Sequence, residues 1–116
     1  GQLHHFSARY PHEFWTAGAG WMVQTFYDYY LFTGDRDFLM QRALPLMKEV
    51  ALFYEDFLID DNNGKLQFIP SVSPENNPGN SESQATRNAT MDIAIARELM
   101  ANLIQVCENL NIDQLF

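Results

Sequence analysis

Apolar residues recur at helical spacing in three stretches of the chain, and the first stretch is apolar on nearly every side. Between about Trp15 and Phe32, only a narrow strip of polar residues interrupts the apolar positions. A helix that is apolar on most of its sides is usually a buried one. Gly34 follows at the point where a glycine commonly ends a helix. The pattern therefore predicts a buried helix over about 15–32.

The second stretch predicts a helix that starts at Asp35 or Asp37 and runs to about Ile59. Its polar and apolar residues lie on opposite sides, which is typical of a surface helix with one buried face. An Asp at its start can accept hydrogen bonds from the unpaired backbone N–H groups of the first turn. Pro45 lies inside this helix and should kink or divide it.

The third stretch predicts a helix with a wide apolar face, which Asn88 or Thr90 caps and which reaches about Asn109. Between the second and third helices, the polar run over 60–65 is typical of a turn. The residues over 66–69 then predict a short strand or extended segment. The fold class is therefore all-α, with about three main helices and one long loop.

Three helices cannot bury a first helix that is apolar on most of its sides. That helix needs further neighbours, which a second copy of the chain or additional polypeptide would supply. We therefore expect residues 1–116 to be a single segment of a larger domain, with helices in an inner and an outer layer, and we expect the isolated segment to self-associate.

Composition and charge exclude several functions. The net charge is −8 with only seven Lys and Arg residues, which argues against nucleic acid as a partner because phosphate contacts need clustered cations. No run is long and apolar enough to span a membrane, and the compartment stays open. His4, His5 and His12 lack metal-ligand spacing, so no metal site is expected. The sequence contains no phosphate-binding glycine loop, so no cofactor is expected.

The long loop from Pro70 to Ala89 contains the best candidate for acid–base chemistry. Loops beyond about 15 residues are uncommon in compact domains and are often functional. Glu75 directly follows Pro74, and the two prolines near it restrict the backbone. A carboxyl held in place and partly desolvated can stay protonated near neutral pH and act as a general acid. The alternative is an ordinary solvated Glu in a polar loop.

Other candidates have structural alternatives. Asp92 falls in the first turn of the third helix, where a carboxylate stabilises the helix by its charge; a hydrogen bond to a sugar hydroxyl is the alternative. Trp15 could offer a flat face to a sugar ring or pack in the core. The run over 88–90 matches an N-glycosylation sequon, although helix capping explains the same residues.

Taken together, blocks of this sequence resemble glycoside hydrolase family 95, which contains inverting α-L-fucosidases and related α-galactosidases and α-L-galactosidases. The resemblance covers nearly the whole chain. It lies in five blocks that occur in the same order: FWTAGAGW (14–21), YLFTGD (30–35), PLMKEVALF (45–53), PSVSPEN (70–76) and TMD (90–92).

The resemblance implies a fold and a set of site residues. The family's catalytic domain is an (α/α)6 barrel, of which this chain would be a partial segment. The Glu of the Ser-Pro-Glu-Asn block is the family's general acid, which implies that role for Glu75. The resemblance also implies substrate contacts for Asn76, Thr90 and Asp92, and a pocket wall at Trp15. The implied substrate partner is an oligosaccharide or glycan.

One part of the family's catalytic machinery has no match here. Family members have a water-activating Asp in a downstream Asp-Gly-Asn-Phe-Gly block and an assisting pair of upstream Asn residues, and neither block occurs in these 116 residues. We therefore expect the chain alone to be inactive. Two alternatives stay open: an enzyme of the same fold with another exo-acting sugar specificity, and a non-catalytic helical module that binds glycans or protein partners.

Overall fold

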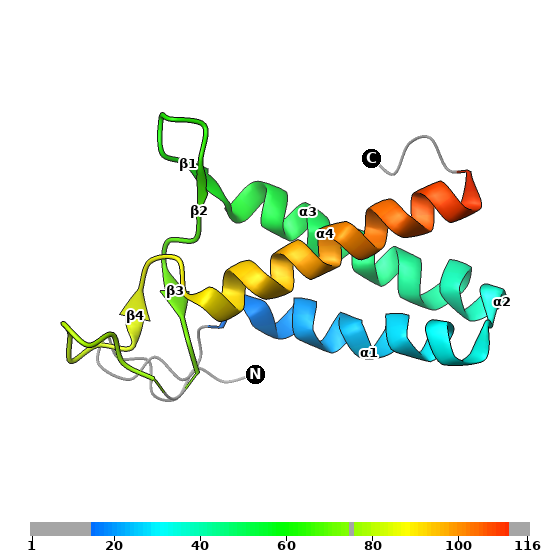
Figure 1. Cartoon of the computed structure of the whole chain (residues 1–116), viewed down its shortest axis with the longest axis horizontal. Helices are drawn as coiled ribbons and strands as arrows, with labels where there is room; N and C mark the ends of the chain where they lie inside the picture. Colours follow the sequence, from blue (N-terminus) through cyan, green and yellow to red (C-terminus); the bar gives the residue numbers. More distant parts are fainter. Residues whose placement is uncertain (1–14, 75, 112–116) are drawn as a thin grey trace.

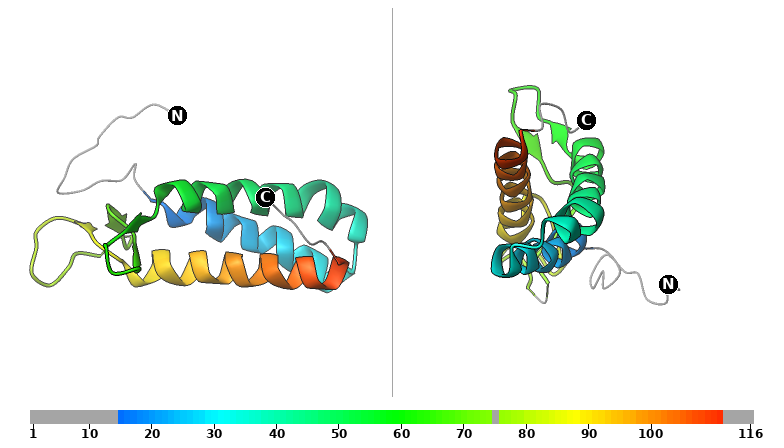
Figure 2. Two further views of the ribbon diagram at one scale, coloured as in Figure 1. Left: turned by 90° about the horizontal axis from the view of Figure 1, so that it is seen from above. Right: turned by 90° about the vertical axis from the view of Figure 1, so that its right-hand side faces the viewer.

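The computed structural model describes residues 15–74 and 76–111, in which three long helices pack side by side (Figures 1 and 2). They are α1 (Ala17–Thr33), α3 (Leu44–Phe57) and α4 (Thr90–Leu110). Helices α1 and α4 begin, and α3 ends, at the end of the molecule where the short strands lie (Figure 1). The all-α prediction is confirmed, and the arrangement is compatible with a segment of a helical barrel.

The core lies between these helices and is built from the apolar positions that recur along each of them. Leu99 and Leu103 of α4 are each 2% exposed, and Met47 of α3 is fully buried. Burying a side chain of this size stabilises the fold by about 1.5–3 kcal/mol. The buried apolar residues form one continuous cluster: Val23, Tyr27, Leu39, Ala43, Leu44, Met47, Val50, Ala51, Tyr54, Phe68, Ala96, Leu99, Leu103 and Val106.

Helix α1 is confirmed as a helix, and Gly34 ends it in the left-handed conformation with φ of 67°. As expected for three helices alone, α1 is not buried on most of its sides, and its burial in a larger domain stays a prediction. α3 and α4 cover only one of its faces, and the exposed fractions elsewhere reach 55% for Trp21, 58% for Leu31 and 91% for Phe32. This apolar surface is available to further polypeptide.

A helical stretch continues from α2 (Arg36–Phe38) through the π-helical segment η1 (Leu39–Ala43) into α3. As predicted, Asp35 caps its start, since the carboxylate accepts a hydrogen bond from the N–H of Phe38 at 2.9 Å. The predicted division near Pro45 takes the form of η1. Proline lacks an N–H and crowds the carbonyl four residues before it, and a wider π turn at this point accommodates that ring.

Two short hairpins follow α3. Strands β1 (Ile59–Asp60) and β2 (Leu66–Gln67) are antiparallel and enclose the predicted turn. Strands β3 (Ser71–Val72) and β4 (Ala85–Thr86) are also antiparallel, so the segment predicted as one unstructured loop contains a second hairpin. Pairs this short have little periodicity to detect, which explains why the alternation of polar and apolar residues did not reveal them.

Candidate functional site

A polar pocket lies between the end of the β3–β4 hairpin and the start of α4. Its volume is about 240 Å³. Asn76 and Thr90, two of the residues predicted to bind substrate, both line it. The complete lining consists of Ser73, Asn76, Asn77, Pro78, Gln84, Thr86, Arg87, Asn88, Ala89 and Thr90. Eight of these ten residues carry amide, hydroxyl or guanidinium groups, which are donors and acceptors that can bind a sugar.

Hydrogen bonds within the loop hold the far side of this pocket. The side-chain amide of Asn76 donates to the carbonyl oxygen of Pro74 at 3.1 Å, and its backbone N–H donates to the carbonyl of Ser73 at 3.1 Å. The side-chain amide of Asn77 donates to the carbonyl of Glu82, also at 3.1 Å. These bonds fold the loop back on itself, so that its polar side chains converge on one hollow.

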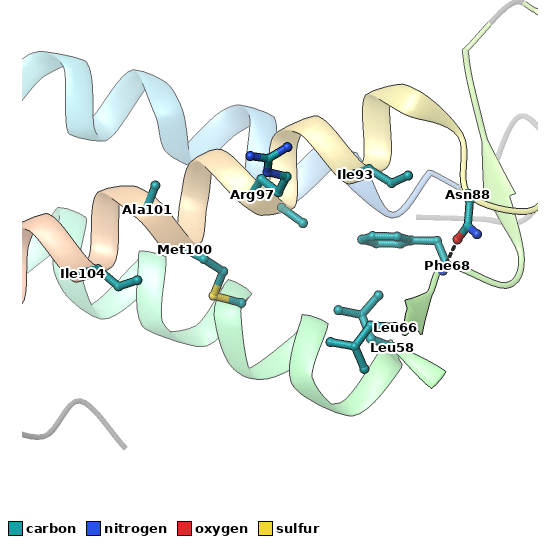
Figure 3. Close-up of a pocket in the computed structure, with 10 residues that line it drawn as sticks. Leu58, Leu66, Phe68, Asn88, Ile93, Arg97, Met100, Ala101 and Ile104 are labelled. Atoms are coloured by element: carbon teal, nitrogen blue, oxygen red, sulfur yellow. Dashed lines mark hydrogen bonds between the residues drawn. The ribbon is translucent and has the colours of Figure 1, made fainter. Parts of the chain in front are cut away.

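Asn88 closes the base of the loop. Its side-chain oxygen accepts a hydrogen bond from the N–H of Phe68 at 2.8 Å (Figure 3). Its own N–H donates to the carbonyl of Phe68 at 3.1 Å. Asn88 has a φ of 54°, a conformation that Asn tolerates better than most residues. The predicted caps are therefore wrong: Ala89 is the N-cap of α4 without a side-chain bond, and Thr90 is the first helical residue.

Asp92 lies beneath the pocket and is completely buried. Its Oδ2 accepts a short hydrogen bond from the hydroxyl of Ser71, and that hydroxyl accepts a bond from the N–H of Ala89 at 2.9 Å. Its other oxygen, Oδ1, has no hydrogen-bond partner among residues 15–74 and 76–111. Burying a carboxylate costs free energy unless partners compensate it, which marks Asp92 as a residue with a specific task.

Tyr54 of α3 completes the buried polar cluster under the pocket. Its hydroxyl donates to the carbonyl of Thr16 at 3.0 Å. Burial, assisted by the negative charge of Asp92, raises the pKa of Tyr54 to about 12, so the phenol stays protonated at neutral pH. Gly20 makes this packing possible, because a Cβ there would come within 2.7 Å of the Tyr54 hydroxyl and 2.6 Å of Ile95.

The remaining predicted site residues have different positions. Trp15 is partly buried, with its ring centroid 5.6 Å from that of Trp21, and it does not line the polar pocket. Its indole N–H has no acceptor within the described part of the chain. Glu75 lies outside the described residues, although its neighbours on either side belong to the turn that borders the pocket.

Sequence analysis missed several polar residues of this region. Gln84 and Arg87 line the pocket, and Ser71 holds Asp92, yet none was predicted as a site residue. Their contacts depend on the β3–β4 register, in which Ser71 pairs with Thr86. The run Asn77-Pro78-Gly79 is a turn signal that could have indicated a hairpin here.

A second, apolar hollow lies on the other side of Asn88. Its volume is about 480 Å³, and Figure 3 shows Phe68 pointing into it between Leu58 and Ile93. We call this the apolar groove; it is lined by Leu58, Leu66, Phe68, Asn88, Ile93, Ala96, Arg97, Met100, Ala101 and Ile104. Few polar groups face it, so it offers a sugar little hydrogen bonding.

Within 15–74 and 76–111, no three His, Cys, Asp or Glu side chains come close enough together to hold a metal ion. Nor does any helix in those ranges have the length and apolar character needed to cross a membrane.

Comparison with known proteins agrees with the family resemblance of the sequence. The family model described as the glycosyl hydrolase family 95 catalytic domain matches residues 3–116. Alpha-L-fucosidase 2 of Arabidopsis thaliana is 33% identical over 97 residues, which cover 81% of this chain and 12% of that protein. The chain thus spans a small part of the length of this relative. Because the family model matches nearly the whole sequence, the chain belongs to the glycoside hydrolase family 95 catalytic domain.

Proposed function

We propose that this chain is an internal segment of an inverting exo-glycoside hydrolase that removes terminal α-L-fucose or a galactose-type sugar. Family membership and the fucosidase relative support glycoside hydrolysis as the activity. The observation that best supports the location is the polar pocket, because it is lined by Asn76, the residue directly after the proposed acid. Its amide and hydroxyl groups suit a sugar substrate.

Glu75 donates the proton in this proposal. A glycosidic oxygen leaves poorly as an alkoxide, so a carboxylic acid must protonate it as the bond breaks. Inversion also needs a second carboxylate that activates water on the opposite face of the sugar, about 6.5–9.5 Å from the acid. The family's block for that base has no match in the 116 residues. The proposed activity therefore belongs to the complete enzyme, and the chain alone is inactive.

The substrate contacts in this proposal come from the loop and from the start of α4. Asn76 and Thr90 hydrogen-bond the sugar hydroxyls from the polar pocket. Trp15 does not line that pocket, so we propose it as a wall of a neighbouring part of the substrate site, with a face that can pack against the apolar side of a sugar ring. Asp92 is completely buried, which favours an indirect role over the direct sugar contact that the resemblance implies.

The test is replacement of Glu75 by Gln in the complete enzyme. A Gln cannot donate a proton, so hydrolysis of natural glycosides should fall by about 10²–10⁴-fold. Aryl glycosides with an activated leaving group need little protonation and should be affected much less. Glu55→Gln is the matched control, because Glu55 is exposed on α3.

The same preparation tests the stereochemical outcome. NMR of the first-formed sugar should show the anomer opposite to that of the substrate. Equal losses with natural and activated substrates in the Glu75→Gln variant would exclude the acid role, and binding of glycans without any hydrolysis by the complete protein would favour a non-catalytic module.

A further inference from the structure

Ser71 and Asp92 join the two ends of the loop that borders the polar pocket. We propose that this pair, the Ser71–Asp92 clamp, positions the pocket for catalysis, and that Asp92 is a positioning residue and does not itself contact the sugar. The inference rests on the proposed function, because it assigns a role within the same site.

The hydrogen bonds define the clamp. Ser71 belongs to β3, two residues before Ser73 of the pocket, and Asp92 lies two residues after Thr90. The Ser71 hydroxyl donates to Asp92 Oδ2 and accepts from the N–H of Ala89 at 2.9 Å. One hydroxyl group thus joins the strand that enters the loop to the helix that leaves it.

Complete burial distinguishes the clamp from ordinary surface hydrogen bonds. Ser71 and Asp92 are both 0% exposed. A hydrogen bond to a charged group contributes more than a neutral one, and removing one partner leaves the other buried and unsatisfied. The clamp is therefore costly to break, which is the property needed in a device that fixes geometry.

Simple helix capping does not explain Asp92. A carboxylate in the first turn could accept a bond from a backbone N–H of its own helix, but the start of α4 has no side-chain cap bond. Asp92 instead accepts a hydrogen bond from Ser71, which belongs to a different element. Its carboxylate serves the connection between β3 and α4.

A direct sugar contact by Asp92 is also disfavoured by the surrounding packing. Asp92 does not line the polar pocket, whereas its helix neighbour Thr90 does. Ala89, which is 7% exposed, lines the pocket and bonds to Ser71. A substrate in the pocket would thus meet Thr90 and Ala89, with the clamp supporting them from below.

The experiment compares clamp variants in the complete enzyme. Ser71→Ala removes both bonds of the hydroxyl, whereas Asp92→Asn keeps an oxygen that can accept from Ser71 and serves as the conservative variant. Thr25→Ala and Asp56→Asn are matched controls, since both residues are exposed on helices outside the loop and neither lines the pocket. Glu75→Gln is measured in the same series.

Two readouts separate positioning from general stability. We expect amide hydrogen exchange over 76–88 to accelerate by about 10- to 100-fold in Ser71→Ala, because this is the effect of losing one buried hydrogen bond to a charged group. The amides of α3 should keep their protection. We also expect kcat for natural glycosides to fall more than kcat for activated aryl glycosides. Asp92→Asn should retain most of both properties, and the controls should match the parent.

Three results would overturn the inference: equal acceleration of exchange in the loop and α3, equal kinetic losses with both substrate types, or no change at all in Ser71→Ala. The outcome for Glu75→Gln is independent of these. If that variant shows no leaving-group dependence, the proposed function fails, and exchange alone then decides the clamp. If it does show the dependence while Ser71→Ala does not, only the clamp is refuted.

Discussion

The two hollows on either side of Asn88 differ in both size and chemistry. The apolar groove is about twice as large, at 480 Å³, as the polar pocket, at 240 Å³. Size alone would favour the groove as the substrate site. A sugar, however, presents hydroxyl groups that cost free energy when buried without partners, and only the smaller pocket supplies many donors and acceptors. Chemistry here outweighs volume.

The surroundings of the two hollows also differ. The polar pocket is built from a loop whose own hydrogen bonds fix its shape. The groove is lined by apolar side chains of α4 that stay exposed, including Ile104, which is 59% exposed. An exposed apolar surface of this kind is usually covered by protein in the complete molecule. We therefore propose that the pocket binds the ligand and that the groove packs against further polypeptide.

The sharpest way to break this assignment is to substitute residues in both hollows of the complete enzyme. Asn76→Ala and Thr90→Val each remove hydrogen-bonding groups from the pocket and should lower kcat/KM by about 10-fold. Ile104→Ala in the groove should leave kcat/KM of the folded enzyme within about twofold of the parent, because loss of a packing contact away from the substrate lowers stability and not the rate of the chemical step. Steady-state kinetics on one natural glycoside measures all three. A loss in Ile104→Ala as large as in the pocket variants would reverse the assignment.

The second prediction concerns the groove and the isolated chain. We expect the 116-residue chain to self-associate, since Ile104 and the flanks of α1 expose apolar surface. Ile104→Glu should then weaken association by about tenfold, which corresponds to the burial of part of one apolar side chain. Sedimentation equilibrium measures the dissociation constant, with Glu108→Gln on the same helix as control. A chain that is monomeric and melts cooperatively would contradict the expectation.

These two regions also differ in how far the sequence could predict them. Helix α4, which lines the groove, was predicted nearly to its last residue because its apolar positions recur over 21 residues. The division near Pro45 followed from the chemistry of proline. Its realisation as the π-helical segment η1 did not, since the choice between a kink and a wider turn depends on packing against α1.

The polar pocket was predicted only in part. Asn76 and Thr90 were assigned from motif blocks, and both line the pocket. The roles of Ser71 and Asn88 depend on contacts between residues 18 to 21 positions apart, which no local pattern reveals. A side chain that bonds to the backbone of another element leaves no periodic signal, so such residues require a structure.

Tyr54 connects the two regions and provides the third prediction. Its ring contacts Phe68 of the groove at a centroid distance of 5.8 Å, and its hydroxyl bonds to Thr16 in the cluster under the pocket. Tyr54→Phe should lower the free energy of unfolding by about 1 kcal/mol at neutral pH, the contribution of one hydrogen bond. Chemical denaturation measures this, and Tyr29→Phe, at an exposed position, is the control.

The pH dependence of the same variant sharpens the test. The pKa of Tyr54 is raised from 10.0 to about 12 in the folded protein, so the unfolded state loses its proton first as pH rises. The stabilising contribution is complete below pH 10 and is lost as pH rises through 12. The parent should therefore lose more stability than Tyr54→Phe across that range. Parallel curves for the two proteins would refute the burial of the phenol.

The smallest expected effect is at the β1–β2 turn, which holds Leu66 at the rim of the groove. Asp61 accepts hydrogen bonds from the N–H groups of Asn63 at 2.9 Å and Lys65 at 3.2 Å. These bonds, that of Asn63 foremost, lower the pKa of Asp61 below its ordinary value of 3.8. Asp61→Ala should accelerate amide exchange in the hairpin, while exchange in α3 and binding in the polar pocket stay unchanged.

The sign of the pH effect follows from that lowered pKa. The ionised carboxylate stabilises the turn fully above pH 3.8, and its contribution is lost as pH falls through the lower folded-state value. Amide exchange followed by NMR should therefore distinguish Asp61→Ala from the parent at neutral pH and lose that distinction in acid. Asp56→Ala, exposed on α3, is the control. If Asp61→Ala instead altered sugar hydrolysis in the complete enzyme, the groove and its rim would belong to the active site, and the separation of the two hollows would be wrong.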